Sequence, residues 1–580
     1  MGVCSSAQEK KKKLTNNSKY NNNYFNTDPN INIDNNNKIN NKKNSLFEKG
    51  EHYYLRKTDL NYNNNNNNEE ENEYYMNIDL FLSLENIKNI ENNYSIKLSI
   101  CNNKKINQFT YLGETEKSNG NEINFGSNFG VNYFFEKEQI LNGEIIENSI
   151  IVSNFSITIG QIMGSKGLTK RIPIKNIKNE SDLCDLIIEA KKREENNLRN
   201  ILYFNLSLIL ERNNFKPNLR NIFLVIKTYN DGKNYRPIYK SNEHNIECNK
   251  EFKFNEIKLE SNVKEMKLNF EIYDSLDDAL IGNGIILIKE LLNNKNNPFS
   301  LELDDPINNY QIGTLKINLK MIKKNSFIDY LKGGMQINME IAIDYTASNG
   351  DPQKPSSYHY INGHFPNCYE NAITNCCSIV SCYDEDQKFP VYGFGGIPPN
   401  NSNEVSHCFN INFENNPDID GLENIIPIYK KSLEKVILSG PTYFCPVIQS
   451  VYDKIKNNKN EPDFINHYFI LMILTDGLIH DMKKTIDILV DCAYIPLSVI
   501  IIGIGDADFT NMNILDGDEN LLVNSKNETT KRDLVQFVEY NKFKDFLSNG
   551  KNNDLTEEVL KEIPRQVEEY YELMNDFKFV

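Results

Sequence analysis

Three oxygen-bearing side chains follow one short apolar run and are spaced two residues apart. The run is Met339–Ile343, and the side chains are those of Asp344, Thr346 and Ser348. In an open α/β sheet, the loops at the carboxyl ends of the strands bring side chains from distant parts of the chain together. Hard divalent cations such as Mg²⁺ prefer oxygen ligands and keep several waters, so carboxylates and hydroxyls suffice. The pattern therefore predicts a strand that ends in a site for a hard cation.

Two further residues of the same kind occur downstream. Thr442 follows a Ser-Gly-Pro turn, and Asp476 closes the apolar run that begins at Phe469. Together the five residues read Asp-x-Thr-x-Ser, then Thr, then Asp, and we expect them to hold Mg²⁺ or Mn²⁺. The alternative is that the acids are ordinary strand-end residues and the hydroxyls are turn formers. The presence of all five pieces in one order favours the metal site.

This set of residues resembles the metal-ion-dependent adhesion site of von Willebrand factor A-type domains, and the sequence around it resembles the copine family. The resemblance is strongest from about residue 330 to 571. It implies that Thr346, Ser348 and Thr442 ligate the metal directly, and that Asp344 and Asp476 ligate it directly or through water. The resemblance rests on six sequence segments: Asp344–Pro352 (DYTASNGDP), Tyr392–Pro398 (YGFGGIP), Ser439–Thr442 (SGPT), Leu474–Asp481 (LTDGLIHD), Ile502–Phe509 (IGIGDADF) and Arg532–Tyr540 (RDLVQFVEY).

An enzymatic site is the main alternative, because an Asp at a strand end can accept a phosphoryl group. Hydrolases of that kind usually carry a second Asp two residues on, and here that position is Thr346. His359, His364 and His480 lie near these segments without the spacing of a catalytic triad or a zinc site, and we expect them in loops or at the surface. We therefore expect no catalytic residues, and a site that captures a carboxylate of a protein partner.

The last third of the chain alternates apolar runs with helical patterns, which is typical of an α/β domain. Continuously apolar strands indicate a parallel sheet that is covered on both faces. We predict a doubly wound, Rossmann-like domain of the A type over residues 330–575. Its predicted strands are Gln336–Asp344, Phe389–Phe394, Tyr468–Leu474 and Leu497–Ile504, and its predicted helices include Leu422–Val436, Pro446–Lys456, Met482–Ala493 and Leu555–Met574, the last with a break at Pro564.

Two stretches ahead of this domain alternate apolar and polar residues in short runs. Period-two alternation over several such runs predicts antiparallel β-sandwiches. We place one sandwich at residues 73–180 and a second at 201–325. The charged segment between them, residues 181–200, is predicted to be a linker with a helix at 181–197.

Their position ahead of an A-type domain makes the two sandwiches resemble the paired C2 domains of copines. C2 calcium sites use several Asp carboxylates on two loops, yet no Asp occurs between Leu80 and Glu180. In the second sandwich Asp274, Asp277 and Asp278 stand where the third loop would be, while the first loop, 211–221, has no Asp. Because calcium affinity follows the number of carboxylates, we expect a weak calcium loop at most. Basic residues of the first loop are candidates for contact with anionic lipid headgroups: Arg212, Lys216 and Arg220.

The first 14 residues match an acylation signal. Gly2 stands at the acceptor position for myristoylation with Ser6 at the favoured hydroxyl position, and Cys4 is a candidate for palmitoylation. A basic cluster, Lys10–Lys13, supplies a further membrane signal. Residues 15–72 are rich in Asn and too polar to fold, so they are predicted to be a disordered spacer. An unmodified tail is the alternative.

The net charge of −16 argues against a general nucleic-acid binder. No apolar run reaches the length of a membrane span. We therefore expect a cytoplasmic, peripheral protein on the inner face of the plasma membrane or another membrane.

The resemblance implies a calcium-dependent phospholipid-binding adaptor that recruits protein partners through the A-type domain. The alternatives are phosphoryl transfer by that domain and a soluble scaffold without a calcium response.

Overall fold

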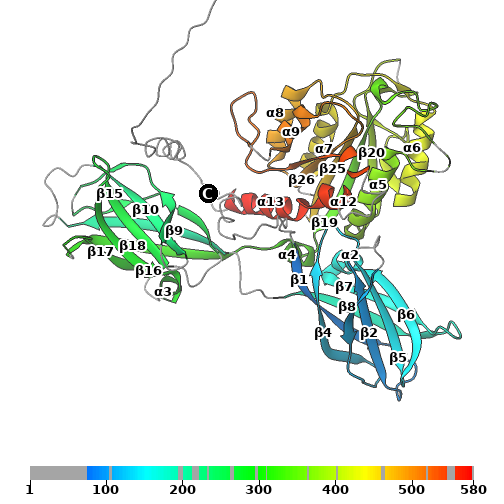
Figure 1. The fold of residues 1–580 in the computed structure, drawn as a ribbon, viewed down its shortest axis with the longest axis horizontal. Helices are drawn as coiled ribbons and strands as arrows, with labels where there is room; N and C mark the ends of the chain where they lie inside the picture. Colours follow the sequence, from blue (N-terminus) through cyan, green and yellow to red (C-terminus); the bar gives the residue numbers. More distant parts are fainter. Residues whose placement is uncertain are drawn as a thin grey trace, which may run out of the picture.

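The computed structural model describes three folded modules between residues 75 and 577 (Figure 1). Within that range it leaves out residues 103–107, 194–199, 212–220, 231–233, 248, 256, 262–266, 294–297, 309, 362, 364, 400–402, 459–460, 462–463, 465, 518–519 and 545–554. In the part of the chain that it describes, no helix is both long and apolar enough to cross a membrane.

The first module is a sandwich of two four-stranded antiparallel sheets. Their strand orders are β4-β1-β8-β7 and β3-β2-β5-β6. Buried and half-buried positions alternate strictly along β1, as expected for a sheet with one face on the core. The elements are β1 (Met76–Glu85), β2 (Tyr94–Cys101), β3 (Thr110–Glu114), β4 (Ile123–Tyr133), β5 (Ile140–Glu147), β6 (Ile150–Thr158), α2 (Ile159–Met163), η3 (Lys166–Leu168), β7 (Thr169–Lys175) and β8 (Asp182–Lys192).

The predicted helix at 181–197 is wrong, because residues Asp182–Lys192 form strand β8 in the first sheet. Leu186, Ile188 and Ala190 are buried, and the residues between them, Ile187 and Glu189, are half-buried. The segment therefore alternates with period two, but its many charges suggested a solvent-exposed helix. It is a central strand of the first module between β1 and β7.

The second module has a hydrophobic core of its own, which includes Phe204, Phe270 and Leu315. Its ten strands form one antiparallel sheet, in which eight follow the order β11-β10-β15-β16-β17-β18-β9-β13, and β12 pairs with β10 and β14 with β9. The elements are β9 (Asn200–Leu210), β10 (Asn221–Asn230), β11 (Asn234–Lys240), β12 (His244–Asn245), β13 (Phe252–Lys253), β14 (Ile257–Ser261), β15 (Lys267–Asp274), β16 (Leu280–Leu287), α3 (Ile288–Asn293), β17 (Phe299–Asp304) and β18 (Gln311–Lys323).

The third module is an α/β domain around a sheet of order β22-β20-β19-β25-β26-β27, in which the strands from β20 to β27 run parallel. The prediction of two antiparallel β modules followed by such a domain is confirmed. Its strands are β19 (Gln336–Asp344), β20 (Lys388–Phe394), β21 (Gly396–Ile397), β22 (Phe409–Asn410), β23 (Asp418–Asp420), β24 (Ile437–Leu438), β25 (His467–Thr475), β26 (Leu497–Gly503) and β27 (Val535–Glu539).

Helices cover both faces of this sheet (Figure 1). Along β25, Ile470 and Met472 contribute to one apolar core, and Leu471 and Ile473 contribute to the core on the other face. This is why the strands read as continuously apolar. The helices are α4 (Phe327–Lys332), η5 (Ala347–Asn349), α5 (Cys368–Val380), η6 (Ser381–Tyr383), η7 (Leu422–Asn424), α6 (Ile425–Leu433), α7 (Cys445–Asn458), α8 (Met482–Cys492), α9 (Thr510–Asp516), α10 (Asn541–Lys544), α12 (Leu555–Leu560) and α13 (Ile563–Phe577).

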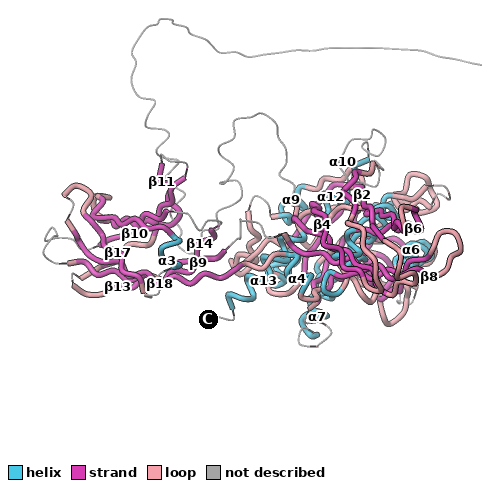
Figure 2. Tube along the Cα trace, turned by 90° about the horizontal axis from the view of Figure 1, so that it is seen from below, coloured by secondary structure: helices cyan, strands magenta, loops and turns pink. Residues whose placement is uncertain are grey.

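The first module packs directly on the α/β domain, and the two share one apolar core. Phe135 lies against Phe327 of α4 and Tyr383 of η6, with ring centroids 5.2 and 5.0 Å apart. Lys192 Nζ also lies 3.0 Å from Asp329 Oδ2. The second module, in contrast, stands to one side of this pair and is reached through the long strands β9 and β18 (Figure 2).

Candidate metal centre

Two neighbouring parallel strands place the two acids of the predicted site at the same edge of the sheet. Asp344 is the last residue of β19, and Asp476 directly follows β25. β19 pairs with β25 through Ile343 and Leu474, so the chain leaves both strands side by side. Asp344 is fully buried and Asp476 is 6% exposed. The carboxyl edge of the sheet thus holds two nearly enclosed carboxyl groups.

The loop after β19 brings its hydroxyls onto these acids. Ser348 Oγ donates to Asp476 Oδ1 at 2.8 Å, and Thr346 Oγ1 lies 2.9 Å from Ser348 Oγ and 3.5 Å from Asp476 Oδ1. The Thr346 N–H donates to Asp344 Oδ1 at 2.8 Å. Four of the five predicted residues therefore contact one another directly.

Thr442 reaches the cluster from a third loop, which pairs with the first through a bridge between Thr346 and Ser439. A Cβ atom on Gly477 would lie 3.4 Å from Thr442 Oγ1 and 3.7 Å from Ser348 Oγ. The three loops therefore meet around Gly477, whose missing side chain leaves room between them. The structure brings all five predicted residues together.

A second layer of side chains, which the sequence analysis missed, orients the two acids. Thr475 Oγ1 donates to Asp344 Oδ2 at 2.6 Å, and Asn349 Nδ2 donates to Asp476 Oδ1 at 3.0 Å. Tyr369 OH in turn donates to Asn349 Oδ1 at 2.6 Å. Thr475 and Asn349 are sequence neighbours of the predicted ligands Asp476 and Ser348, and this proximity was the signal that could have identified them. Nothing local pointed to Tyr369.

His359 belongs to this second layer: it lies in a loop, as expected, but its side chain is buried and not at the surface. Its side chain is fully buried, and its Nε2 lies 2.8 Å from the main-chain oxygen of Asp344. Its Nδ1 lies 2.7 Å from Tyr429 OH. Burial lowers the pKa of His359 to about 4, so the ring is neutral. Its contact with the main chain of Asp344 stabilises the end of β19. His480 is exposed, and His364 lies outside the described residues.

The electrostatics of the cluster fit a divalent cation. Burial holds the pKa of Asp344 above its ordinary value. Burial, with the neighbouring Asp344 as a further cause, raises the pKa of Asp476 to about 7. Two enclosed carboxyl groups this close repel each other when both are ionised, and a cation between them removes that cost. Carboxylate and hydroxyl oxygens are the donors that Mg²⁺ or Mn²⁺ accepts in a site that keeps waters.

The cluster has only two acids and therefore depends on hydroxyls and water to complete the coordination of an ion. Across the residues that the structure describes, no three His, Cys, Asp or Glu side chains lie together as a metal site.

The loop between β15 and β16 uses its acids to hold its own turns. The Leu276 N–H donates to Asp274 Oδ1 at 2.9 Å, and the Ala279 N–H donates to Asp277 Oδ1 at 3.1 Å. Asp278 has a positive φ of 53° in the same turn. The first loop of this module, with Arg212, Lys216 and Arg220, lies outside the described residues, as do Gly2 and Cys4.

Comparison with known proteins supports these assignments of fold. A model of the copine family matches residues 357–578. Copine-A of Dictyostelium discoideum is 32% identical over 503 residues, which are 83% of this chain and 81% of that protein.

Solved structures are similar to parts of the chain at low scores. The two consecutive C2 domains of extended synaptotagmin 2 cover 43% of this chain and 93% of their own at 13% identity, with a TM-score of 0.16. The manganese-loaded TRAP protein of Plasmodium vivax covers 37% of this chain and 74% of its own at 12% identity, with a TM-score of 0.23. Because Copine-A is 32% identical over 83% of this chain and the copine model matches its α/β domain, the chain belongs to the copine family.

Proposed function

We propose that this chain is a membrane adaptor that binds phospholipid through its C2 modules and captures protein partners through a divalent cation at the α/β domain. The observation that carries the second part is the convergence of Asp344, Thr346, Ser348, Thr442 and Asp476 from three loops at one edge of the sheet. A cation there would keep a coordination position for a carboxylate of the partner. The proposal assigns no catalytic residue, because the side chains that contact the two acids are hydroxyls and an amide.

Family membership supports calcium-dependent phospholipid binding. The acids available for calcium in the second module are Asp274, Asp277 and Asp278, and two of them already accept hydrogen bonds from their own loop. We therefore propose a weak response, with calcium needed at about 10⁻⁴ to 10⁻³ M.

Co-sedimentation of the full, non-acylated chain with phosphatidylserine vesicles tests this. Without the acyl chain, any binding must come from the folded modules. We expect binding to increase at millimolar calcium relative to chelator, and we expect Asp274→Asn together with Asp277→Asn to remove the increase. Absence of binding under both conditions would contradict a lipid role for the C2 modules.

We further propose that myristoylation at Gly2, with palmitoylation at Cys4 or the basic cluster Lys10–Lys13 as second signal, holds the protein on a cytoplasmic membrane face. The motif residues Met1–Ser6 support this. A Gly2→Ala chain is expected to leave the membrane fraction of cells in chelator. If it sediments with membranes as the wild type does, the anchor is elsewhere.

A further inference from the structure

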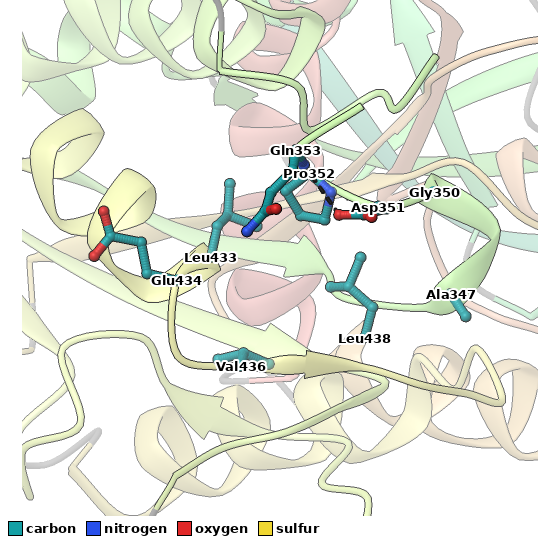
Figure 3. Close-up of a pocket in the computed structure, with 9 residues that line it drawn as sticks. All are labelled: Ala347, Gly350, Asp351, Pro352, Gln353, Leu433, Glu434, Val436 and Leu438. Atoms are coloured by element: carbon teal, nitrogen blue, oxygen red, sulfur yellow. Dashed lines mark hydrogen bonds between the residues drawn. The ribbon is translucent and has the colours of Figure 1, made fainter. Parts of the chain in front are cut away.

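A shallow pocket of about 350 Å³ adjoins the metal-site residues on the α/β domain (Figure 3). One wall is the loop that follows β19, and the other is the end of α6 with β24. Ala347, which lies between the ligand candidates Thr346 and Ser348, belongs to the pocket lining. Leu438 on the opposite wall directly precedes Ser439, whose carbonyl accepts the Ala347 N–H at 2.7 Å. None of the five proposed metal ligands lines the pocket, but it lies directly beside the loop that carries Thr346 and Ser348.

Apolar and polar side chains both line the pocket: Leu433, Val436, Leu438 and Pro352 are apolar, and Asp351, Gln353 and Glu434 are polar. Leu433 and Val436 are each 7% exposed, and Leu438 and Pro352 are half-buried. An aliphatic side chain placed here would be removed from water on several sides.

An acidic group marks the end of the pocket away from the metal-site residues. In Figure 3, Leu433, Pro352 and Leu438 lie between Glu434 at one end and Ala347 at the other. Glu434 is exposed, and two of the lysines near it, Lys430 and Lys435, contact other groups. Lys430 Nζ lies 2.7 Å from Glu370 Oε2, and Lys435 Nζ lies 5.5 Å from the ring centre of Phe413. A basic residue of a partner is complementary to Glu434 at this end.

We infer that the pocket selects the partner: a protein segment that presents a carboxylate to the metal, an aliphatic side chain to Leu433, Val436 and Leu438, and a basic side chain to Glu434. The inference rests on the proposed metal-dependent capture, and it adds the chemistry of what is captured. The metal binds any partner segment that presents a carboxylate, and the pocket discriminates among such segments by their neighbouring side chains.

The test uses the full chain and a random-peptide library displayed on phage, selected in Mn²⁺ and eluted with EDTA. From the wild type we expect eluted peptides enriched in an acidic residue followed closely by an aliphatic and then a basic residue. Leu438→Thr, which keeps a residue suited to β24, should lose the aliphatic enrichment and keep the acidic one. Glu434→Lys should replace the preference for a basic residue with one for an acidic residue.

Ile514→Thr serves as a matched control, because this exposed isoleucine of α9 is not part of the pocket. It should select the same peptides as the wild type. A synthetic peptide of the selected sequence should bind about tenfold more tightly than its version with Ser in the aliphatic position.

Two contrary results are distinguishable. Peptides enriched in acidic residues alone, with the same composition from wild type and Leu438→Thr, would overturn the pocket and leave metal-dependent capture standing. Peptides that elute equally without EDTA, from wild type and from Thr442→Val, would overturn both.

Discussion

At the scale of residues, the candidate site depends on a few oxygen atoms held in place by neighbours that do not touch the ion. Asp476 Oδ1 accepts a hydrogen bond from Asn349, and Asp344 Oδ2 accepts one from Thr475. Such supporting groups fix the direction of the ligand lone pairs. Removing one of them should weaken metal binding without removing a ligand.

Asn349→Ala is the corresponding prediction. The side-chain amide of Asn349 orients Asp476, so its loss should reduce Mn²⁺ affinity by about 10- to 100-fold. Tyr369→Phe, which removes only the hydroxyl that holds Asn349, should have a smaller effect in the same direction. Isothermal titration with Mn²⁺ measures both.

Asn375→Ala is the control, because this Asn is exposed on α5. It should titrate as the wild type does. If Asn349→Ala also titrates as the wild type does, the second layer has no part in metal binding.

The sequence predicted the five candidate ligands because their identities and spacing are local or repeat a known pattern. The supporting residues were not predictable in the same way. Tyr369 and His359 reach the site only because α5 and the loop before it fold back over the end of β19. Their partners are main-chain and amide groups, which leave no signature in a single sequence.

At the scale of elements, the contact between the first module and the α/β domain depends on the short helix α2 fitting closely against η6. A Cβ atom on Gly164, at the end of α2, would overlap the main-chain oxygen of Cys382. Tyr133 OH and Tyr383 OH form a buried hydrogen bond in the same contact. Gly164 has a helical φ of −80°, so the requirement for glycine there is steric.

Gly164→Ala should therefore loosen this contact. We expect faster amide hydrogen exchange in α2 and η6, because the two surfaces can no longer approach as closely. The matched control is Gly363→Ala, since a Cβ atom on Gly363 would meet nothing within 4 Å. Unchanged exchange in Gly164→Ala would mean that the modules accommodate the extra methyl group and that the close fit is not required.

The packing of α13 near the start of β27 should make stability depend on pH through Asp533. Burial and the nearby Glu562 raise the pKa of Asp533 to about 8, although Arg565 lies 3.2 Å away. Arg565 also contacts Glu562 and Glu569 and is 43% exposed, so its charge is shared and partly screened. In the unfolded chain the pKa is about 4.

Because the folded state holds this proton more tightly, the group stabilises the fold below pH 4, and this contribution is lost as pH rises from about 4 to 8. Asp533→Asn cannot ionise, so its melting temperature relative to wild type should rise by about 3 °C or more between pH 5 and pH 8.5. A difference between the two proteins that is constant over this range would show that Asp533 has an ordinary pKa.

Element types were predictable where periodicity and composition agreed, as in β19 and β25. They were not predictable where the two conflicted. β8 alternates with period two, but its charged residues favoured a helical linker, and only pairing with β1 and β7 reveals its place in the sheet. Its position also sets the end of the first module, which the predicted boundary at residue 180 placed too early.

At the scale of the whole molecule, the first module and the candidate metal site lie at opposite edges of the α/β sheet. α4 and η6, which contact the first module, precede β19 and β20, whereas Asp344 and Asp476 follow β19 and β25. The first module therefore does not cover the carboxyl edge of the sheet, where the candidate metal site lies. The proposed lipid contact of the β modules and the proposed partner contact at the metal site would therefore use different surfaces of one chain.

The most direct test of the account is calorimetric titration of the full, metal-free chain with Mn²⁺. We predict one ion bound per chain with high affinity, and loss of that binding in Thr442→Val and in Asp476→Asn. Asp274→Asn, in the second module, should leave it intact. Mn²⁺ binding that is unchanged in Thr442→Val and Asp476→Asn would contradict the assignment of the metal site and with it the proposed capture of partners.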